Sequence, residues 1–134
     1  MKCVLVCSPL RATEIYSVDD NLKFAALACQ FVTRMGYAPF APHLFCTQFL
    51  DEKNEVHRRK GMDIGLSFLR HCDEIWVFRR SKMDVNSQGM NAEIHQAIRD
   101  GIRVVEVLDL EQSGEYINGL ILGKNNEDWT MFTV

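Results

Sequence analysis

Two neighbouring stretches decide how this chain folds: the apolar run Glu74-Ile75-Trp76-Val77-Phe78, and the run Ser87-Gln88-Gly89-Met90-Asn91-Ala92-Glu93-Ile94-His95-Gln96-Ala97 that follows a polar loop. The first run is typical of a strand that is buried on both faces of a parallel sheet. The second begins with residues that favour a helix start and then spaces apolar side chains as a helix does. Together they predict a strand, a loop and a helix, the unit from which parallel sheets are built.

The same alternation recurs along the chain. Strands are predicted over residues 2–7, 37–41, 73–78 and 102–108, and helices over residues 20–35, 51–69 and 90–100. This order predicts an α/β fold: a flavodoxin-like three-layer sandwich with a central parallel sheet and strand order 2-1-3-4-5. The 134 residues suit a single domain, 1–134, with a core of its own.

Single residues predict where the helices end or bend. Gly36 and Gly101 supply left-handed stops after two of them. Gly61 and Gly65 each cost the middle helix up to ~1 kcal/mol relative to Ala, which favours a kink or break there. The last helix is expected to bury a stripe made of Met90, Ile94, Ala97 and Ile98.

The pattern leaves residues 109–134 open. Residues 117–122 and 129–134 are apolar and flank a polar turn at 123–128. One of these segments could be the fifth strand or a contact between subunits.

Composition excludes several classes of function. A net charge of −3 gives no broad basic surface for a nucleic acid polymer, and no segment has the uninterrupted apolar length of a membrane span. The five cysteines are odd in number and lack a Cys-x-x-Cys pair, which predicts reduced thiols and a cytoplasmic protein. No metal is expected, because His43 with Cys46 and His71 with Cys72 lack a matching second pair of ligands.

Two basic runs are expected to be solvated faces, namely residues 57–60 (His-Arg-Arg-Lys) and residues 79–82 (Arg-Arg-Ser-Lys). The second run has the greater interest, because it adjoins the stretch that starts at Ser87.

The predicted strand order places a site at the carboxyl ends of the first and third strands, where the winding direction reverses. The loops that leave these strands are Ser8-Pro9-Leu10-Arg11 and residues 79–89. Gly89 lets the backbone approach a ligand, and the amides at the helix start favour a phosphate or carboxylate, with Ser87 as an added donor. A purely structural helix cap would use the same residues.

Glu93 sits on or beside the inward stripe of this helix, because it lies three residues after Met90 and four before Ala97. Two interpretations stay open at this point. Glu93 could be a flanking residue that complements the helix dipole, or a carboxylate within reach of whatever the loop binds.

Several segments together resemble the nucleoside 2-deoxyribosyltransferase-like superfamily. They are residues 7–11, residues 36–44, residues 72–78 and the block Ser87-x-Gly89-Met90-x-Ala92-Glu93-Ile94-x-x-Ala97. The resemblance covers residues 2–108, and its most specific part is the block from Ser87 to Glu93. Within the superfamily, the chain looks most like small bacterial and phage proteins of the DUF4406/DUF7768-like class.

The resemblance implies cleavage of an N-glycosidic bond without a cofactor, by a hydrolase or a deoxyribosyltransferase. Glu93 matches the superfamily's nucleophile. A serine at the position of Ser87, where nucleoside transferases carry aspartate, implies a nucleoside 5′-monophosphate or related nucleotide. The implied substrate contacts are Ser8, Pro9, Arg11, His43, Ser87, Gly89 and Met90. Relatives complete the pocket from a neighbouring subunit, so a homodimer or higher homo-oligomer is expected.

The chain also departs from the active enzymes. They usually end the first strand with a tyrosine or another polar group, where this chain has Cys7 and Ser8. They carry a carboxylate in the helix before the third strand that manages the proton of the base, and Asp63 is the candidate here. His43 could supply the proton instead. The alternatives are a binding protein that senses or sequesters a nucleotide without turnover, and an interaction subunit with a vestigial pocket.

Overall fold

A computed structural model describes residues 1–81 and 85–108. Its sheet contains four parallel strands in the order β2-β1-β3-β4. Their bounds are β1 Cys3–Cys7, β2 Ala38–Phe40, β3 Glu74–Arg79 and β4 Arg103–Leu108. The predicted α/β fold is confirmed, with its parallel sheet and the order of the first four strands. The expected fifth strand and the tail from residue 109 lie outside the described residues.

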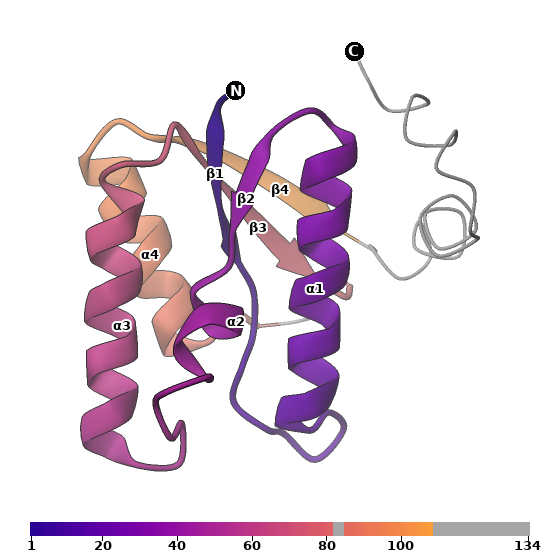
Figure 1. Ribbon diagram of the computed structural model, residues 1–134, viewed down its shortest axis with the longest axis vertical. Coiled ribbons are helices and arrows are strands. Elements are labelled where there is room, and N and C mark those ends of the chain that lie inside the picture. Colours follow the sequence, from indigo (N-terminus) through magenta and orange to yellow (C-terminus); the bar gives the residue numbers. More distant parts are fainter. Residues whose placement is uncertain (82–84, 109–134) are drawn as a thin grey trace.

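Four helices accompany this sheet within the described residues: α1 Val18–Arg34, α2 Pro42–Cys46, α3 Glu55–Leu69 and α4 Gln88–Arg99. Figure 1 shows α1 on one face of the sheet and α3 with α4 on the other, which makes three layers. The short α2 lies near the end of the sheet at which β1 and β3 finish. None of the helices in the described part is long and apolar enough to cross a membrane.

Alternation along the strands assigns each side chain to one of two cores. In β1, Val4 and Val6 pack with α1, while Leu5 and Cys7 pack with the residues of α3 and α4. Strand β3 repeats this arrangement, as Trp76 and Phe78 face α1 whereas Ile75 and Val77 face the other side. Cys7 therefore ends β1 fully buried on the side of α3 and α4.

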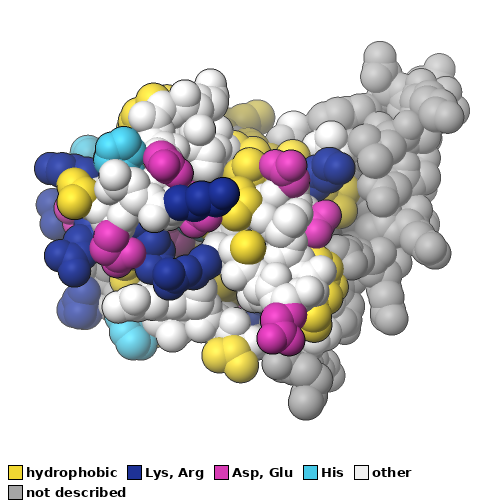
Figure 2. Space-filling model, turned by 90° about the horizontal axis from the view of Figure 1, so that it is seen from below, with side chains coloured by type: hydrophobic (Ala, Val, Ile, Leu, Met, Phe, Trp, Pro, Cys, Tyr) yellow, Lys and Arg dark blue, Asp and Glu magenta, His cyan; other side chains and the backbone are white. Residues whose placement is uncertain are grey.

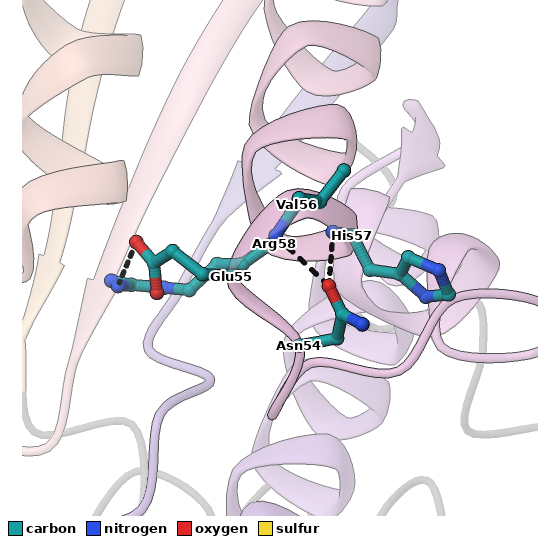
Figure 3. Close-up of polar contacts among 5 residues, drawn as sticks. All are labelled: Asn54, Glu55, Val56, His57 and Arg58. Atoms are coloured by element: carbon teal, nitrogen blue, oxygen red, sulfur yellow. Dashed lines mark hydrogen bonds and ion pairs between the residues drawn. The ribbon is translucent and has the colours of Figure 1, made fainter.

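The predicted helix ends are largely right. Gly36 and Gly101 follow α1 and α4 with φ of 90° and 70°, values that suit glycine. Ser17 begins α1 through a capping box in which its side chain accepts from the N–H of Asp20 and the Asp20 carboxylate accepts from the N–H of Ser17. Before α3, the side chain of Asn54 accepts hydrogen bonds from the amides of Val56 and His57, as Figure 3 shows.

Two predictions about the helices were wrong. Helix α3 runs unbroken through Gly61 and Gly65, so these glycines do not break it. In α4, Ile98 is 63% exposed while Glu93 is only 8% exposed. The buried stripe of α4 is therefore Met90, Glu93 and Ala97, and a carboxylate takes a place that the pattern gave to an apolar side chain.

Candidate functional site

A cavity opens where the carboxyl ends of β1, β2 and β3 meet the amino ends of α3 and α4. Figure 2 looks onto this end of the molecule and shows Lys and Arg side chains gathered on the side that carries α3. The cavity is lined by residues from four segments of the chain: Leu10, Arg11, Pro42, His43, Cys46, Thr47, Leu50, Glu52, His57, Arg58, Gly61, Met62, Leu66, Ser87, Gly89, Ala92 and Glu93.

Most residues predicted to touch the substrate are brought together here. Arg11, His43, Ser87, Gly89 and Glu93 all line the cavity, although they come from two different loops, from α2 and from α4. The order β2-β1-β3 explains this, because it makes neighbours of the ends of all three strands. Their roles toward a ligand stay predictions.

Glu93 is the buried carboxylate of this cavity. Burial raises its pKa from 4.5 to about 7, because a charged carboxylate loses the stabilisation that water would give it. A hydrogen bond from the Cys7 thiol opposes this shift by stabilising the ionised form. The thiol itself has a strongly raised pKa, caused first by burial and then by the charge of Glu93, so it stays protonated and can donate. At neutral pH, Glu93 is therefore poised between its two protonation states.

Gly65 makes room for this carboxylate. A Cβ atom at Gly65 would lie 2.9 Å from Oε2 of Glu93, closer than real Cβ atoms approach, and 3.4 Å from Cγ of Pro42, at the edge of ordinary contact. By contrast, a Cβ at Gly61 would meet only Leu50 Cδ1, at an ordinary 3.7 Å. Gly65, which the sequence pattern predicted to kink the helix, instead allows a close contact between α3 and Glu93.

The amino end of α4 offers donors to the cavity. The Ser87 hydroxyl accepts a hydrogen bond from the N–H of Met90 over 3.2 Å, so the helix cap predicted for this serine is formed. Its own O–H hydrogen remains available to a ligand, because a hydroxyl can donate while it accepts. Gly89 has nothing within 4 Å of the position of a Cβ, so the space beside it is open.

The loop after β1 is held in place by hydrogen bonds from side chains to its backbone carbonyls. Ring atom Nε2 of His43 lies 2.8 Å from the Ser8 carbonyl oxygen, and since a carbonyl can only accept, Nε2 carries the proton. Burial lowers the pKa of His43, opposed by this hydrogen bond, so the ring is neutral at pH 7. Further along the loop, Nδ2 of Asn21 donates to the carbonyls of Leu10 (2.9 Å) and Arg11 (3.2 Å).

The other predicted residues lie outside the cavity lining. Ser8 is buried, and among the described residues its Oγ has no hydrogen-bond partner. Pro9 is half-buried beside it. Met90 is 2% exposed, and its carbonyl oxygen lies 3.8 Å from Cys7 Sγ, so it competes with the Glu93 carboxylate for the single thiol hydrogen. Asp63 is exposed, because the register of α3 turns Met62 and Leu66 inward instead.

Of the two basic runs, the structure brings residues 57–60 to the cavity, and not residues 79–80, which sequence pattern had favoured. Arg79 forms an ion pair with Glu106 of β4 (2.9 Å), and the guanidinium of Arg80 stacks 3.6 Å from the centre of the Tyr16 ring. The run at residues 57–60, expected to be a solvated face, supplies His57 and Arg58 to the cavity. Amphipathic spacing gave no signal for them, because they are polar residues on the face of α3 that looks toward a polar site.

In the described residues, no group of three or more His, Cys, Asp or Glu side chains is arranged to hold a metal ion. Cys46 and His43 both line the cavity, and the pKa of the Cys46 thiol is raised by burial and by Glu93.

A sequence profile described as a domain of unknown function, DUF7768, matches residues 2–107 of this chain. The chain belongs to the DUF7768 family. No curated protein matches its sequence. The family that the motifs predicted is thus confirmed.

This DUF7768 protein also resembles a solved structure, that of the 2-deoxyribosyltransferase from the psychrotolerant bacterium Bacillus psychrosaccharolyticus. The two chains share 16% identity with a TM-score of 0.60, over 79% of this chain and 72% of the other. At this level of identity the likeness establishes a common fold, which is the deoxyribosyltransferase-like α/β fold.

Proposed function

We propose that this DUF7768 protein cleaves the N-glycosidic bond of a nucleoside 5′-monophosphate or a related nucleotide, with Glu93 as the nucleophile. The observation that carries the proposal is the seat of Glu93: a buried carboxylate inside a cavity, at the carboxyl edge of the sheet and beside the amino end of α4. The fold shared with a 2-deoxyribosyltransferase supports the proposal.

In the proposed reaction, an ionised oxygen of Glu93 forms a bond to the anomeric carbon of the sugar. The bond from this carbon to the base nitrogen breaks, and its electron pair leaves with the base, which takes up a proton. Water or a second base then attacks the anomeric carbon and releases Glu93 as a carboxylate. Water gives hydrolysis, whereas a second base gives transfer.

Three side chains are candidates to handle the proton of the leaving base. Asp63, the carboxylate expected for this role, is exposed on α3 and outside the lining. His43 commits its Nε2 proton to the Ser8 carbonyl, so it offers Nδ1 as an acceptor for the base. Atom Nδ1 of His57 accepts from the N–H of Asp51 (2.9 Å), which leaves the proton of the neutral ring on Nε2. We therefore assign to His57 a hydrogen bond from its Nε2–H to the departing base, which takes its proton from water.

The test is incubation with a panel of nucleosides and nucleoside 5′-monophosphates, followed by chromatography. We expect free base from at least one monophosphate, and more slowly or not at all from the matching nucleoside. Stoichiometric binding with the ligand recovered intact would instead support a protein that senses or sequesters a nucleotide. The raised pKa of Glu93 favours that second function, since a protonated carboxyl can donate a hydrogen bond to a bound base.

The rate of base release is expected to depend on pH through Glu93. Only the ionised carboxylate is a nucleophile, so the rate should fall about tenfold per pH unit below a pKa of about 7. The measurement is kcat/KM between pH 5 and pH 9, which reports the ionisation of the free protein. An acid limb centred near the ordinary glutamate value of 4.5 would contradict the burial of the reacting group.

Removing the Cys7 thiol is expected to raise the pKa of Glu93 further, because the thiol donates to the ionised carboxylate. We expect the Glu93 signal in carbon-detected NMR to titrate at higher pH in Cys7→Ala than in the wild type. The Cys7→Ser variant keeps a donor and should titrate at or below the wild-type value. Identical titration of Cys7→Ala and wild type would show that the thiol does not support the carboxylate.

Assembly into a homodimer or higher homo-oligomer remains part of the proposal. It is checked by light scattering of the full chain in solution.

A further inference from the structure

We propose that Arg58 is the residue that makes this pocket prefer a phosphorylated substrate, by binding the 5′-phosphate from the side of α3. This inference rests on the proposed function of the same site. It adds a second cation, on a different element, to Arg11 of the loop after β1.

The packing of α3 against α4 places Arg58 level with Ser87, near the amino ends of the two helices. Both helices connect parallel strands, so they run in the same direction, and Gly65 of α3 lies against Glu93 of α4. Arg58 precedes Gly65 by seven residues (65 minus 58), which is two helical turns or roughly 10 Å along the axis. The same step back along α4 from Glu93 ends beside Ser87. Arg58 and Ser87 therefore lie on the same rim of the cavity, both among its lining residues.

The charge of Arg58 is covered by protein but only weakly neutralised. Its side chain is 17% exposed, so most of it is shielded from water. Its ion pair with Glu55 spans 3.9 Å, and the Glu55 side chain is 63% exposed, which makes this a weak surface pair. Figure 3 shows Arg58 and Glu55 leaving α3 on one side while His57 leaves on the other. The two cavity-lining side chains from this turn thus reach different walls.

A guanidinium suits this task chemically. Its planar fork of donors matches two phosphate oxygens at once, and such charge-assisted pairs are stronger in a partly buried site than in water. In a nucleoside 5′-monophosphate, a few bonds separate the phosphorus from the anomeric carbon. A substrate with its anomeric carbon at Glu93 can therefore reach Ser87 and Gly89, at the start of the same helix, with its phosphate, and Arg58 lines the same cavity.

The test uses probes without a base, so that neither base preference nor turnover enters. The affinities of the full chain for 2-deoxyribose 5-phosphate, 2-deoxyribose and inorganic phosphate are measured by calorimetry. The variants are Arg58→Ala, Arg58→Lys and Arg59→Ala. Arg59 is the matched control, because it is the next residue of α3, carries the same charge, is exposed and does not line the cavity.

We expect Arg58→Ala to weaken binding of the sugar phosphate by roughly tenfold to a hundredfold. Arg58→Lys should lose less, since it keeps the charge without the fork. Arg59→Ala should stay within about twofold of the wild type, and none of the variants should alter the weak affinity for 2-deoxyribose. Melting curves confirm that each variant is folded.

Equal losses in Arg58→Ala and Arg59→Ala would overturn the inference, because only the general charge of α3 would then matter. Equal affinity of the wild type for the phosphorylated and unphosphorylated sugars would overturn it as well. The outcome is separate from that of the proposed reaction: a protein that releases no base from any nucleotide can still bind sugar phosphate through Arg58.

Discussion

Replacing Glu93 by Gln is expected to abolish release of base while making the folded protein more stable at pH 8. The rate should fall by roughly a thousandfold or more, because an amide cannot form the bond to the anomeric carbon and the loss of a nucleophile is among the most severe single changes in an enzyme. Rates are measured with the best nucleotide of the panel under single-turnover conditions.

The gain in stability follows from the raised pKa of the carboxyl. The unfolded chain loses this proton near pH 4.5, whereas the folded protein holds it up to about pH 7. Between these values the folded state binds more protons, so the free energy of unfolding falls as pH rises through that window. Above pH 7 the folded protein carries a buried charge whose cost is roughly 3 kcal/mol at about 1.4 kcal/mol per unit of pKa. The neutral Gln side chain does not carry this cost.

Urea denaturation of wild type and Glu93→Gln at pH 5 and pH 8 measures this difference. The two proteins should differ little at pH 5, and the variant should be more stable by up to ~3 kcal/mol at pH 8. Base release by Glu93→Gln at the wild-type rate would end the proposal for the nucleophile. The same difference in stability between wild type and variant at pH 5 and at pH 8 would show that the Glu93 carboxyl titrates normally.

Changing Gly65 to Ala is expected to lower the rate of base release strongly while changing the stability of the fold little. An ordinary core substitution, by contrast, acts mainly on stability. The new Cβ would meet Oε2 of Glu93 at 2.9 Å, and the carboxylate is the far end of a flexible side chain, so it gives way. The helix gains up to ~1 kcal/mol from replacing glycine, which offsets part of the crowding against Glu93. Base release should fall by roughly a hundredfold, because a displacement of about 1 Å in a reacting group has that order of effect.

Gly61→Ala is the matched control. It makes the same change in the same helix, also at the cavity, but its Cβ meets only Leu50 at 3.7 Å. We expect it to be slightly more stable than the wild type and to keep its activity within a fewfold. Unchanged activity in both variants would mean that the position of the Glu93 carboxylate does not limit the reaction.

The fold was predictable because each strand has a local signal in the sequence. Runs such as residues 75–78 are apolar throughout, and glycines with positive φ follow α1 and α4 where the pattern placed them. The inward position of Glu93 was also within reach of helical spacing, although Ile98 was wrongly taken for a buried residue of the same helix.

What the sequence could not reveal depends on how α3 meets α4. Gly65 lowers helix propensity wherever it occurs, and only the neighbouring helix shows that it makes room for a carboxylate. Arg58 has the same local character as Arg59, yet one lines the cavity and the other faces solvent. The role of Asn21 could not be predicted for a similar reason, since the carbonyls that it holds are ten and eleven residues away along the chain.

The buried thiol at the end of β1 gives the protein a spectroscopic reporter of its own. The S–H stretching vibration absorbs in an infrared region that amide and water bands leave clear, and its frequency follows the strength of the hydrogen bond that the thiol donates. Because the single thiol hydrogen of Cys7 has the Glu93 carboxylate and the Met90 carbonyl as alternative acceptors, its band should shift when that carboxyl gains or loses a proton or when a sugar displaces it. The state of the site can thus be followed in the unlabelled protein, without turnover.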